Sequence, residues 1–133
     1  MTHYTGGCLC GALRYVADAA PRSAGYCFCA DCRRASGSGF IPFMNFDAGA
    51  LRFTGMHASH ASPALRGEAV RNFCPTCGSL VFGGPLGATD SHTIYAGSLD
   101  DPSLFRPTIA IFARERPEWM PMPPGLAIFD AMP

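Results

Sequence analysis

The sequence contains no lysine, and all ten of its basic residues are arginine. The absence of lysine excludes Schiff-base chemistry on a lysine amine, and it leaves arginine as the fixed cation that can pair with a carboxylate. Charged residues make up only 15% of the chain, and the formal net charge is zero. A neutral chain with few charges gives no electrostatic argument for binding nucleic acid or an anionic membrane.

Two kinds of apolar segment are also missing. The sequence has no apolar run of about 18 residues, the length that a membrane-spanning helix needs. Its first residues, MTHYTGGC, show neither the basic region nor the apolar core of a secretory leader. We therefore expect a cytoplasmic protein, whose thiols stay reduced. In that compartment seven cysteines indicate metal ligands before disulfides.

Glycine and proline, by contrast, are frequent, with 15 and 12 residues that interrupt the whole chain. The short stretches between them are rich in aromatic and β-branched residues, which favours strands over helices. We expect strands at 12–17, 40–46, 50–55, 69–73, 79–84, 92–97 and 107–113. One short helix is predicted at DCRRAS, ended by Gly37. The 133 residues are predicted to form a single mainly-β domain, 1–133, with an extended proline-rich tail from about Pro117.

The cysteines fall into three clusters. CLC supplies Cys8 and Cys10, CFCADC supplies Cys27, Cys29 and Cys32, and CPTC supplies Cys74 and Cys77. Structural zinc takes four tetrahedral thiolate or imidazole ligands. The CLC and CPTC pairs together supply four thiolates from distant parts of the sequence, which predicts a structural zinc site there.

The remaining cluster, Cys27, Cys29 and Cys32, has one thiol too few for a closed site. Three protein ligands leave the fourth position of a zinc ion open for water or a substrate, as in catalytic sites. The same thiols could instead form a second structural site, closed by Asp31 or by a histidine, or they could be free or form disulfides. The candidate histidines are His3, His57, His60 and His92.

A three-thiolate site favours thiol chemistry over hydrolysis. Three thiolates leave a divalent ion with a net charge near −1, so the site is a weak Lewis acid that suits a soft fourth ligand such as a substrate thiolate. A coordinated thiol is deprotonated, and it could attack a small electrophilic carbonyl. Arg33 and Arg34, which follow the ligands, could pair with substrate carboxylates, and Ser36 could present its hydroxyl near the metal.

Four residues outside the cysteine clusters receive structural predictions. Arg71 precedes the CPTC motif and is expected at the surface. Asp100 and Asp101 in GSLDDP are expected to cap a turn through side-chain-to-backbone hydrogen bonds. Trp119 is expected to pack the tail onto the sheets.

The motifs GGCLCGALRY, CFCADCRRASGSGF, RNFCPTCGSLVF, AGSLDDP and RPEW occur in this order. Together they resemble the glutathione-dependent formaldehyde-activating enzyme family, which also includes centromere protein V-like proteins, from about Tyr4 to Phe129. The resemblance implies a Mss4-like zinc-binding fold of twisted antiparallel sheets with one short helix. It also implies the same division of the cysteines, with a structural zinc at Cys8, Cys10, Cys74 and Cys77 and a catalytic zinc at Cys27, Cys29 and Cys32.

The activity attached to the family name joins formaldehyde and glutathione to S-hydroxymethylglutathione, which is a carbon–sulfur lyase reaction. The resemblance therefore implies two zinc ions per chain and a small thiol and a small aldehyde as substrates, with glutathione as the thiol. Relatives commonly carry histidine at the position of Phe28, and phenylalanine can donate neither a proton nor a hydrogen bond. Phe28 and Phe40 could wall the pocket instead.

Two other functions stay open at this point. Because of Phe28, the chain could be a non-catalytic, zinc-stabilised binding or chaperone-like domain. By analogy with centromere protein V it could bind nucleic acid or microtubules, but its neutral charge and the absence of a basic tail argue against this. We thus expect no nucleic-acid partner and no membrane partner, and the chain could pair with a second copy as a homodimer.

Overall fold

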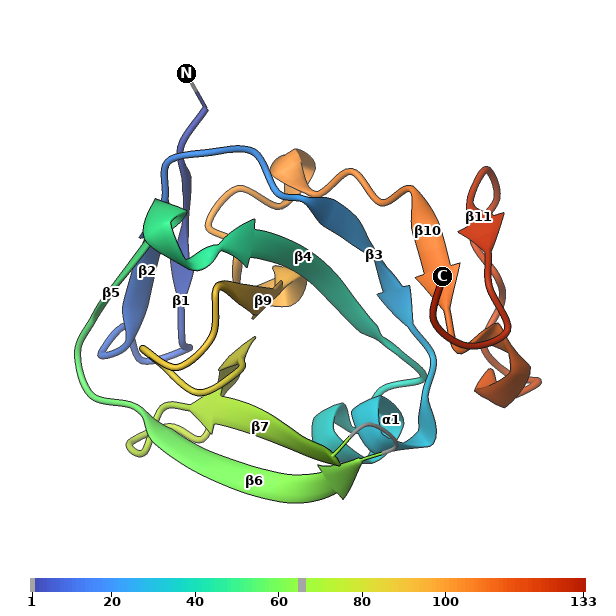
Figure 1. The fold of residues 1–133 in the computed structure, drawn as a ribbon, viewed down its shortest axis with the longest axis horizontal. Coiled ribbons are helices and arrows are strands. Elements are labelled where there is room, and N and C mark those ends of the chain that lie inside the picture. Colours follow the sequence, from blue (N-terminus) through green and yellow to red (C-terminus); the bar gives the residue numbers. More distant parts are fainter. Residues whose placement is uncertain (1, 65–66) are drawn as a thin grey trace.

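The computed structural model describes residues 2–64 and 67–133 (Figure 1). Within them the strands are β1 (Tyr4–Gly7), β2 (Arg14–Ala17), β3 (Ser23–Cys27), β4 (Ile41–Asp47), β5 (Leu51–Thr54), β6 (Ala58–Ala64), β7 (Gly67–Phe73), β8 (Leu80–Gly83), β9 (Ser91–Tyr95), β10 (Ile109–Ile111) and β11 (Ala127–Ile128). The helices are α1 (Ala30–Ser36) and the short 3₁₀ turns η1 (Ala48–Ala50), η2 (Ala96–Ser98), η3 (Pro102–Leu104) and η4 (Ala113–Glu115). The mainly-β class is confirmed. In the described part of the chain, no helix has both the length and the apolar character needed to cross a membrane.

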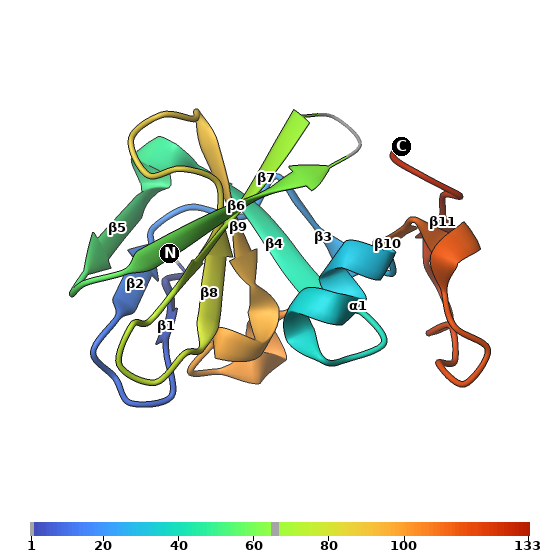
Figure 2. The same cartoon turned by 90° about the horizontal axis from the view of Figure 1, so that it is seen from below.

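The strands form two sheets. The small sheet has the order β1-β2-β5, and the large one has the order β11-β10-β3-β4-β9-β8-β7-β6. Figures 1 and 2 show the large sheet curving from the C-terminal strands, past α1, to the β6–β7 hairpin. The pairs that β10 makes with β3 and with β11 are parallel, so the large sheet is mixed at this edge, while its other pairs are antiparallel as expected. The long connection from β3 to β10 permits parallel pairing, whereas a tight hairpin does not.

All seven predicted strands overlap a strand of the structure, whereas β1, β3, β6 and β11 were not predicted. The β6 sequence ASHASPA is polar and contains Pro63, and it lies at the edge of its sheet, where a missing N–H is tolerated. The predicted helix is confirmed as α1. The Cys29 side chain caps its start, and Gly37 ends it in the left-handed conformation at φ 72°.

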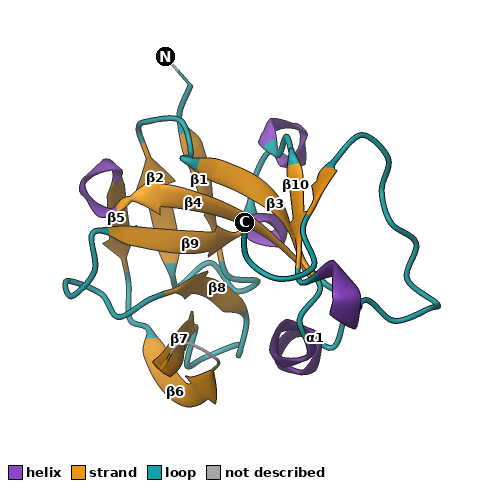
Figure 3. Cartoon of the chain, turned by 45° about the vertical axis from the view of Figure 1, so that its right-hand side comes forward, coloured by secondary structure: helices purple, strands orange, loops and turns teal. Residues whose placement is uncertain are grey.

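The main core lies between the two sheets. Met44 and Phe46 on β4 are fully buried in it, together with Tyr15 on β2 and Leu13 directly before β2. Alternation along β4 turns Phe43 to the other face of the large sheet, where it packs in a separate cluster with Cys27 and Ile111. The two faces of the large sheet (Figure 3) therefore carry separate clusters.

Asp100 and Asp101, in the turn after β9, were both predicted to cap that turn, and only one of them does so. Asp101 caps η3 as expected, because its Oδ1 accepts from the backbone N–H of Ser103 at 3.1 Å. Asp100 instead accepts from the Thr5 hydroxyl at 2.8 Å and from the Arg14 guanidinium, so it ties the β1–β2 hairpin to this turn. Hydrogen bonds from Arg14 and then from Thr5 lower the pKa of Asp100 to about 2.

We expect Asp100→Asn to lower the free energy of unfolding by up to about 1 kcal/mol, as for an exposed ion pair. Because the pKa of Asp100 is lowered, the contribution is present above the ordinary carboxyl pKa and is lost only as the pH falls toward 2. Urea unfolding should therefore give the same destabilisation at every pH from about 8 to about 5.5. Asp18→Asn is the control, because it removes the carboxylate of another exposed ion pair, the one with Arg52. A destabilisation by Asp100→Asn that becomes smaller over this pH range would contradict the lowered pKa of Asp100.

Candidate metal centres

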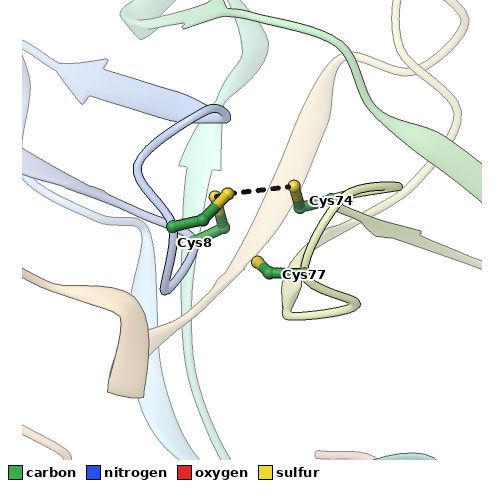
Figure 4. A group of neighbouring side chains, drawn as sticks. Cys8, Cys74 and Cys77 are labelled. Carbon is green, nitrogen blue, oxygen red and sulfur yellow. Dashed lines mark hydrogen bonds between the residues drawn. The ribbon is translucent and has the colours of Figure 1, made fainter.

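Four cysteines from two loops form one group, and Figure 4 shows three of them, Cys8, Cys74 and Cys77, pointing toward one another. Cys8 and Cys10 lie between β1 and β2, Cys74 and Cys77 lie between β7 and β8, and their sulfurs all lie within 4.8 Å of one another. The Cys8 and Cys10 sulfurs are 3.6 Å apart, and those of Cys10 and Cys74 are 3.7 Å apart. Four sulfurs bound tetrahedrally to zinc at about 2.3 Å would be about 3.8 Å apart, so this group fits a zinc ion.

Hydrogen bonds from the surrounding residues lower the pKa of two of these thiols, Cys8 and Cys77. The Leu13 N–H donates to the Cys8 sulfur at 3.2 Å, and the Ser79 hydroxyl lies 3.2 Å from the Cys77 sulfur. Hydrogen bonds from the side chain and then the backbone of Ser79 lower the pKa of Cys77 to about 5. Gly78, at φ 78°, provides the tight turn that brings this segment back toward β8. The loop is thus shaped for a metal before one binds.

The other three cysteines form a second group. Cys27 ends β3, Cys29 caps α1 and Cys32 lies in its first turn, and their sulfurs lie within 4.8 Å of one another. Hydrogen bonds with Cys27 and then with Cys32 lower the pKa of Cys29 to about 2, and contacts with Cys29 and Cys32 raise the pKa of Cys27. The three sulfurs therefore share protons, and a cation is needed for all of them to ionise together.

No fourth ligand joins this group among residues 2–64 and 67–133. Asp31 is exposed and lies outside it, and the buried His92 places its Nδ1 3.1 Å from the carbonyl oxygen of Gly83. Neither Asp31 nor a histidine therefore lies within this group in the described residues. All seven cysteines are free thiols in the structure.

A cleft of about 680 Å³ opens beside Cys27 and Cys32 on the second face of the large sheet. Strand register arranges its floor in three rows. The cysteine row is Ile111, Cys27 and Ile41. The aromatic row is Ile109, Gly25, Phe43 and Tyr95. The polar row is Ser23, Asn45, Thr93, Gly83 and Arg71. All these residues line the cleft except Gly25, and Met132 and Pro133 of the C-terminal segment border it as well.

The predicted substrate-binding residues on α1 lie outside this cleft. Arg34 and Ser36 are exposed, and Arg33 is half-buried. The Ser36 hydroxyl donates to the Cys32 carbonyl at 2.7 Å and accepts from the Ser38 N–H at 3.1 Å. The roles predicted for these three residues stay predictions, and their positions do not favour direct contact with a molecule in the cleft.

The aromatic residues beside the central cysteines also differ from the prediction. Phe28 is fully buried, packs against Tyr26 and Phe40, and does not line the cleft. Phe40 borders a different hollow, with Tyr95 and Gly97. Neither ring therefore walls the cleft. The side chain at position 28 points away from Cys27, because successive residues of extended backbone face opposite sides.

Arg71 is the cleft residue whose position the sequence did not reveal. It was expected at the surface, but it is half-buried and lines the cleft together with Cys32 and Tyr95. The alternation of β7 was a weak guide, because the pairing of β7 with β8 shifts register between Asn72 and Phe73. The face of the sheet on which Arg71 lies could be assigned only once its partner on β8, Gly83, was known.

The C-terminal segment runs back beside the central cysteines. Phe129 packs against the cluster of Cys27, Phe43 and Ile111, and its N–H donates to the Ala110 carbonyl at 2.9 Å. The predicted extended tail is therefore partly a strand, β11, at the sheet edge. Trp119 is 69% exposed, so the prediction that it packs the tail onto the sheets is wrong.

Glu115 joins this segment to the central cysteine loop. Its Oε1 accepts from the backbone N–H of Ala30 at 3.0 Å, directly after Cys29. This contact spans 85 residues, so no local sequence pattern predicts it.

Replacing Glu115 by alanine leaves that N–H without its partner and loosens the loop that carries the three thiols. We expect zinc affinity at this group to fall about 10- to 100-fold, as for other groups that orient metal ligands. Competition with a chromophoric chelator measures the loss. Glu115→Gln, which keeps an acceptor oxygen, and Glu118→Ala, at an exposed position, should both stay close to wild type. Equal zinc affinity in all four proteins would contradict the role of Glu115.

Comparisons with known proteins agree with this arrangement. The crystal structure of a Rhodobacter sphaeroides protein matches with a TM-score of 0.55 and 21% identity, over 72% of this chain and 87% of that chain, and this likeness shows the fold alone. No curated protein matches the chain. The model of the glutathione-dependent formaldehyde-activating enzyme family matches residues 3–115, a range that contains all seven cysteines. The chain therefore belongs to the glutathione-dependent formaldehyde-activating enzyme family.

Proposed function

We propose that this protein is a zinc-dependent carbon–sulfur lyase that joins a thiol such as glutathione to formaldehyde or a similar small aldehyde. The observation that carries the proposal is the group of Cys27, Cys29 and Cys32, which lacks a fourth ligand in the described residues and borders a cleft. Family membership supports the same reaction class.

The donor set fits a zinc ion that Cys27, Cys29 and Cys32 would hold. When bound there, zinc supplies positive charge that favours the ionised form of a thiol at its fourth position. Ile41 and Ile111, which flank Cys27 in the cysteine row, exclude water from this end of the cleft and strengthen electrostatic interactions there. These residues therefore favour reaction with a thiol over hydrolysis.

The Tyr95 hydroxyl is suited to donate a hydrogen bond to the aldehyde oxygen. Burial raises the pKa of its hydroxyl to about 12, so at neutral pH it is a neutral donor in the cleft lining. As the carbon–sulfur bond forms, the carbonyl π electrons move to oxygen, and a hydrogen bond from Tyr95 would stabilise the developing charge. The oxygen then takes up a proton in place of the one lost from the thiol, which gives the hydroxymethyl thioether.

The position of Phe28 weakens the motive for the non-catalytic alternative. The ring is buried among Tyr26 and Phe40 and does not border the cleft, so phenylalanine at this position removes no donor from the cleft lining. The reaction proposed here uses only side chains that line the cleft or belong to the cysteine group.

Exchange NMR tests the proposed reaction. Protein carrying its full zinc complement is mixed with glutathione and formaldehyde, and exchange between the free thiol and its hydroxymethyl adduct is followed. We expect a rate that rises in proportion to the protein concentration above the uncatalysed exchange. A rate equal to the uncatalysed background, with zinc fully loaded, would exclude this reaction.

A further inference from the structure

The polar row at the far end of the cleft contains one arginine, Arg71. Arg71 on β7 pairs with Gly83 on β8, Gly83 pairs with Thr93 on β9, and Thr93 pairs with Asn45 on β4. Gly83 has no side chain, and a β-carbon there would lie only 3.1 Å from the Tyr95 hydroxyl, so the glycine makes room for this hydroxyl. The row therefore combines hydrogen-bonding groups with one cation.

Among the described side chains that line the cleft, Arg71 is the cation and Glu68 is the carboxylate. Within residues 2–64 and 67–133, Arg71 forms no ion pair, and its Nη1 donates only a long hydrogen bond of 3.4 Å to the Ser62 hydroxyl. Its guanidinium therefore keeps donors for another partner. Arg33 and Arg34 do not line the cleft, so they offer no comparable contact.

The lining residues place Arg71 on the α1 side of the cleft. Arg71 lines the cleft together with Cys32. It also borders a second hollow together with Asp31 and Arg34 of α1. The Arg71 side chain therefore extends toward the central cysteines, so a thiol with its sulfur there could place a carboxylate a few bonds away against Arg71.

We propose that Arg71 selects the thiol substrate by pairing with its carboxylate, so that the substrates are short, carboxylate-bearing thiols. This inference rests on the proposed function. The central group carries net negative charge near −1 with zinc bound, and it would repel an anionic thiol. Arg71 offsets this repulsion and can hold a carboxylate through two parallel hydrogen bonds. The aromatic row between the two ends accommodates the short apolar part of such a molecule.

Isothermal titration of the zinc-loaded protein tests this with two probes of equal length, 3-mercaptopropionate and 3-mercaptopropionamide. We expect the wild type to bind the carboxylate at least about tenfold more tightly than the amide. Arg71→Met should bring the ratio close to one and leave affinity for the amide unchanged. Arg71→Lys should keep part of the preference, because it keeps the charge but not the planar fork. Arg34→Met on the neighbouring helix should keep the wild-type ratio.

The outcomes separate the inference from the proposed function. A preference that persists in Arg71→Met, or a wild type that binds both probes equally, would overturn the role of Arg71 alone. If neither thiol binds the zinc-loaded wild type, the proposed thiol chemistry fails as well. Zinc content and circular dichroism verify that each variant is folded, and Arg71→Gln replaces Arg71→Met if the latter is not.

Discussion

Replacing Cys77 by serine should unfold the protein or cost more than about 4 kcal/mol of its free energy of unfolding. The four-cysteine group joins the loop between β1 and β2 to the loop between β7 and β8. These loops are far apart in the sequence, so a metal between them closes a long segment of chain. Zinc bound by such groups contributes about 10–16 kcal/mol of apparent binding energy, whereas small domains have about 5–15 kcal/mol in total.

Circular dichroism during heating, under reducing conditions, measures this effect. Cys10→Ser should behave like Cys77→Ser, since each removes one of the four thiols. Ser79→Ala is the matched control, because it removes the hydroxyl beside the Cys77 sulfur and leaves every thiol in place. It should cost only about 1 kcal/mol, as for a single hydrogen bond. A Cys77→Ser protein that melts at the wild-type temperature would show that this group does not hold the fold together.

Cys32→Ser should have the opposite profile, with the fold kept and the thiol reaction lost. All three central cysteines come from one short segment, whose backbone is held without metal. The Phe28 N–H donates to the Ile111 carbonyl at 3.1 Å, and the Ala30 N–H donates to Glu115. We expect the loss of one zinc per chain and a fall in thiol–aldehyde exchange of at least about a hundredfold.

Zinc analysis, circular dichroism and exchange NMR on the same preparation distinguish the two functions that the sequence left open. A folded Cys32→Ser protein without activity supports the enzyme. A Cys32→Ser protein that melts as early as Cys77→Ser would mean that the central metal is structural. The non-catalytic binding domain would then be the better interpretation of this chain.

Both cysteine groups could be predicted from spacing, because thiols that are two or three residues apart must lie on one loop. Counting seven thiols against the four that structural zinc takes was enough to divide them, and the structure brings the same four and the same three together. The strands with aromatic and β-branched residues were predicted for the same reason, since their local pattern carries the signal. The helix α1 was predicted together with its final glycine, Gly37.

The cleft could not be predicted in this way, because it depends on strand register. Cys27, Phe43, Tyr95 and Arg71 reach one face through pairings between β3, β4, β9, β8 and β7. A shift of one residue in any pairing would turn those side chains to the other face. Proximity in sequence drew attention to Arg33 and Arg34 instead, although a position on α1 beside the ligands does not place them in the cleft.

Asp100 and Trp119 illustrate the same limit. A turn preference explained Asp101, whose partner is two residues away, but not Asp100, whose partners are Thr5 and Arg14. Trp119 was predicted to pack the tail onto the sheets, yet its side chain is 69% exposed. Local chemistry therefore predicts what a residue can do, and long-range pairing decides where it does so.

Zinc content per chain, measured on the purified protein under reducing conditions, tests the division of the cysteines most directly. Two zinc ions per wild-type chain, with one remaining in Cys32→Ser, is the result expected from a group of four and a group of three. A single zinc ion in the wild type that is retained in Cys32→Ser would contradict it, since the central cysteines would then hold no metal and the proposed reaction would lose its centre.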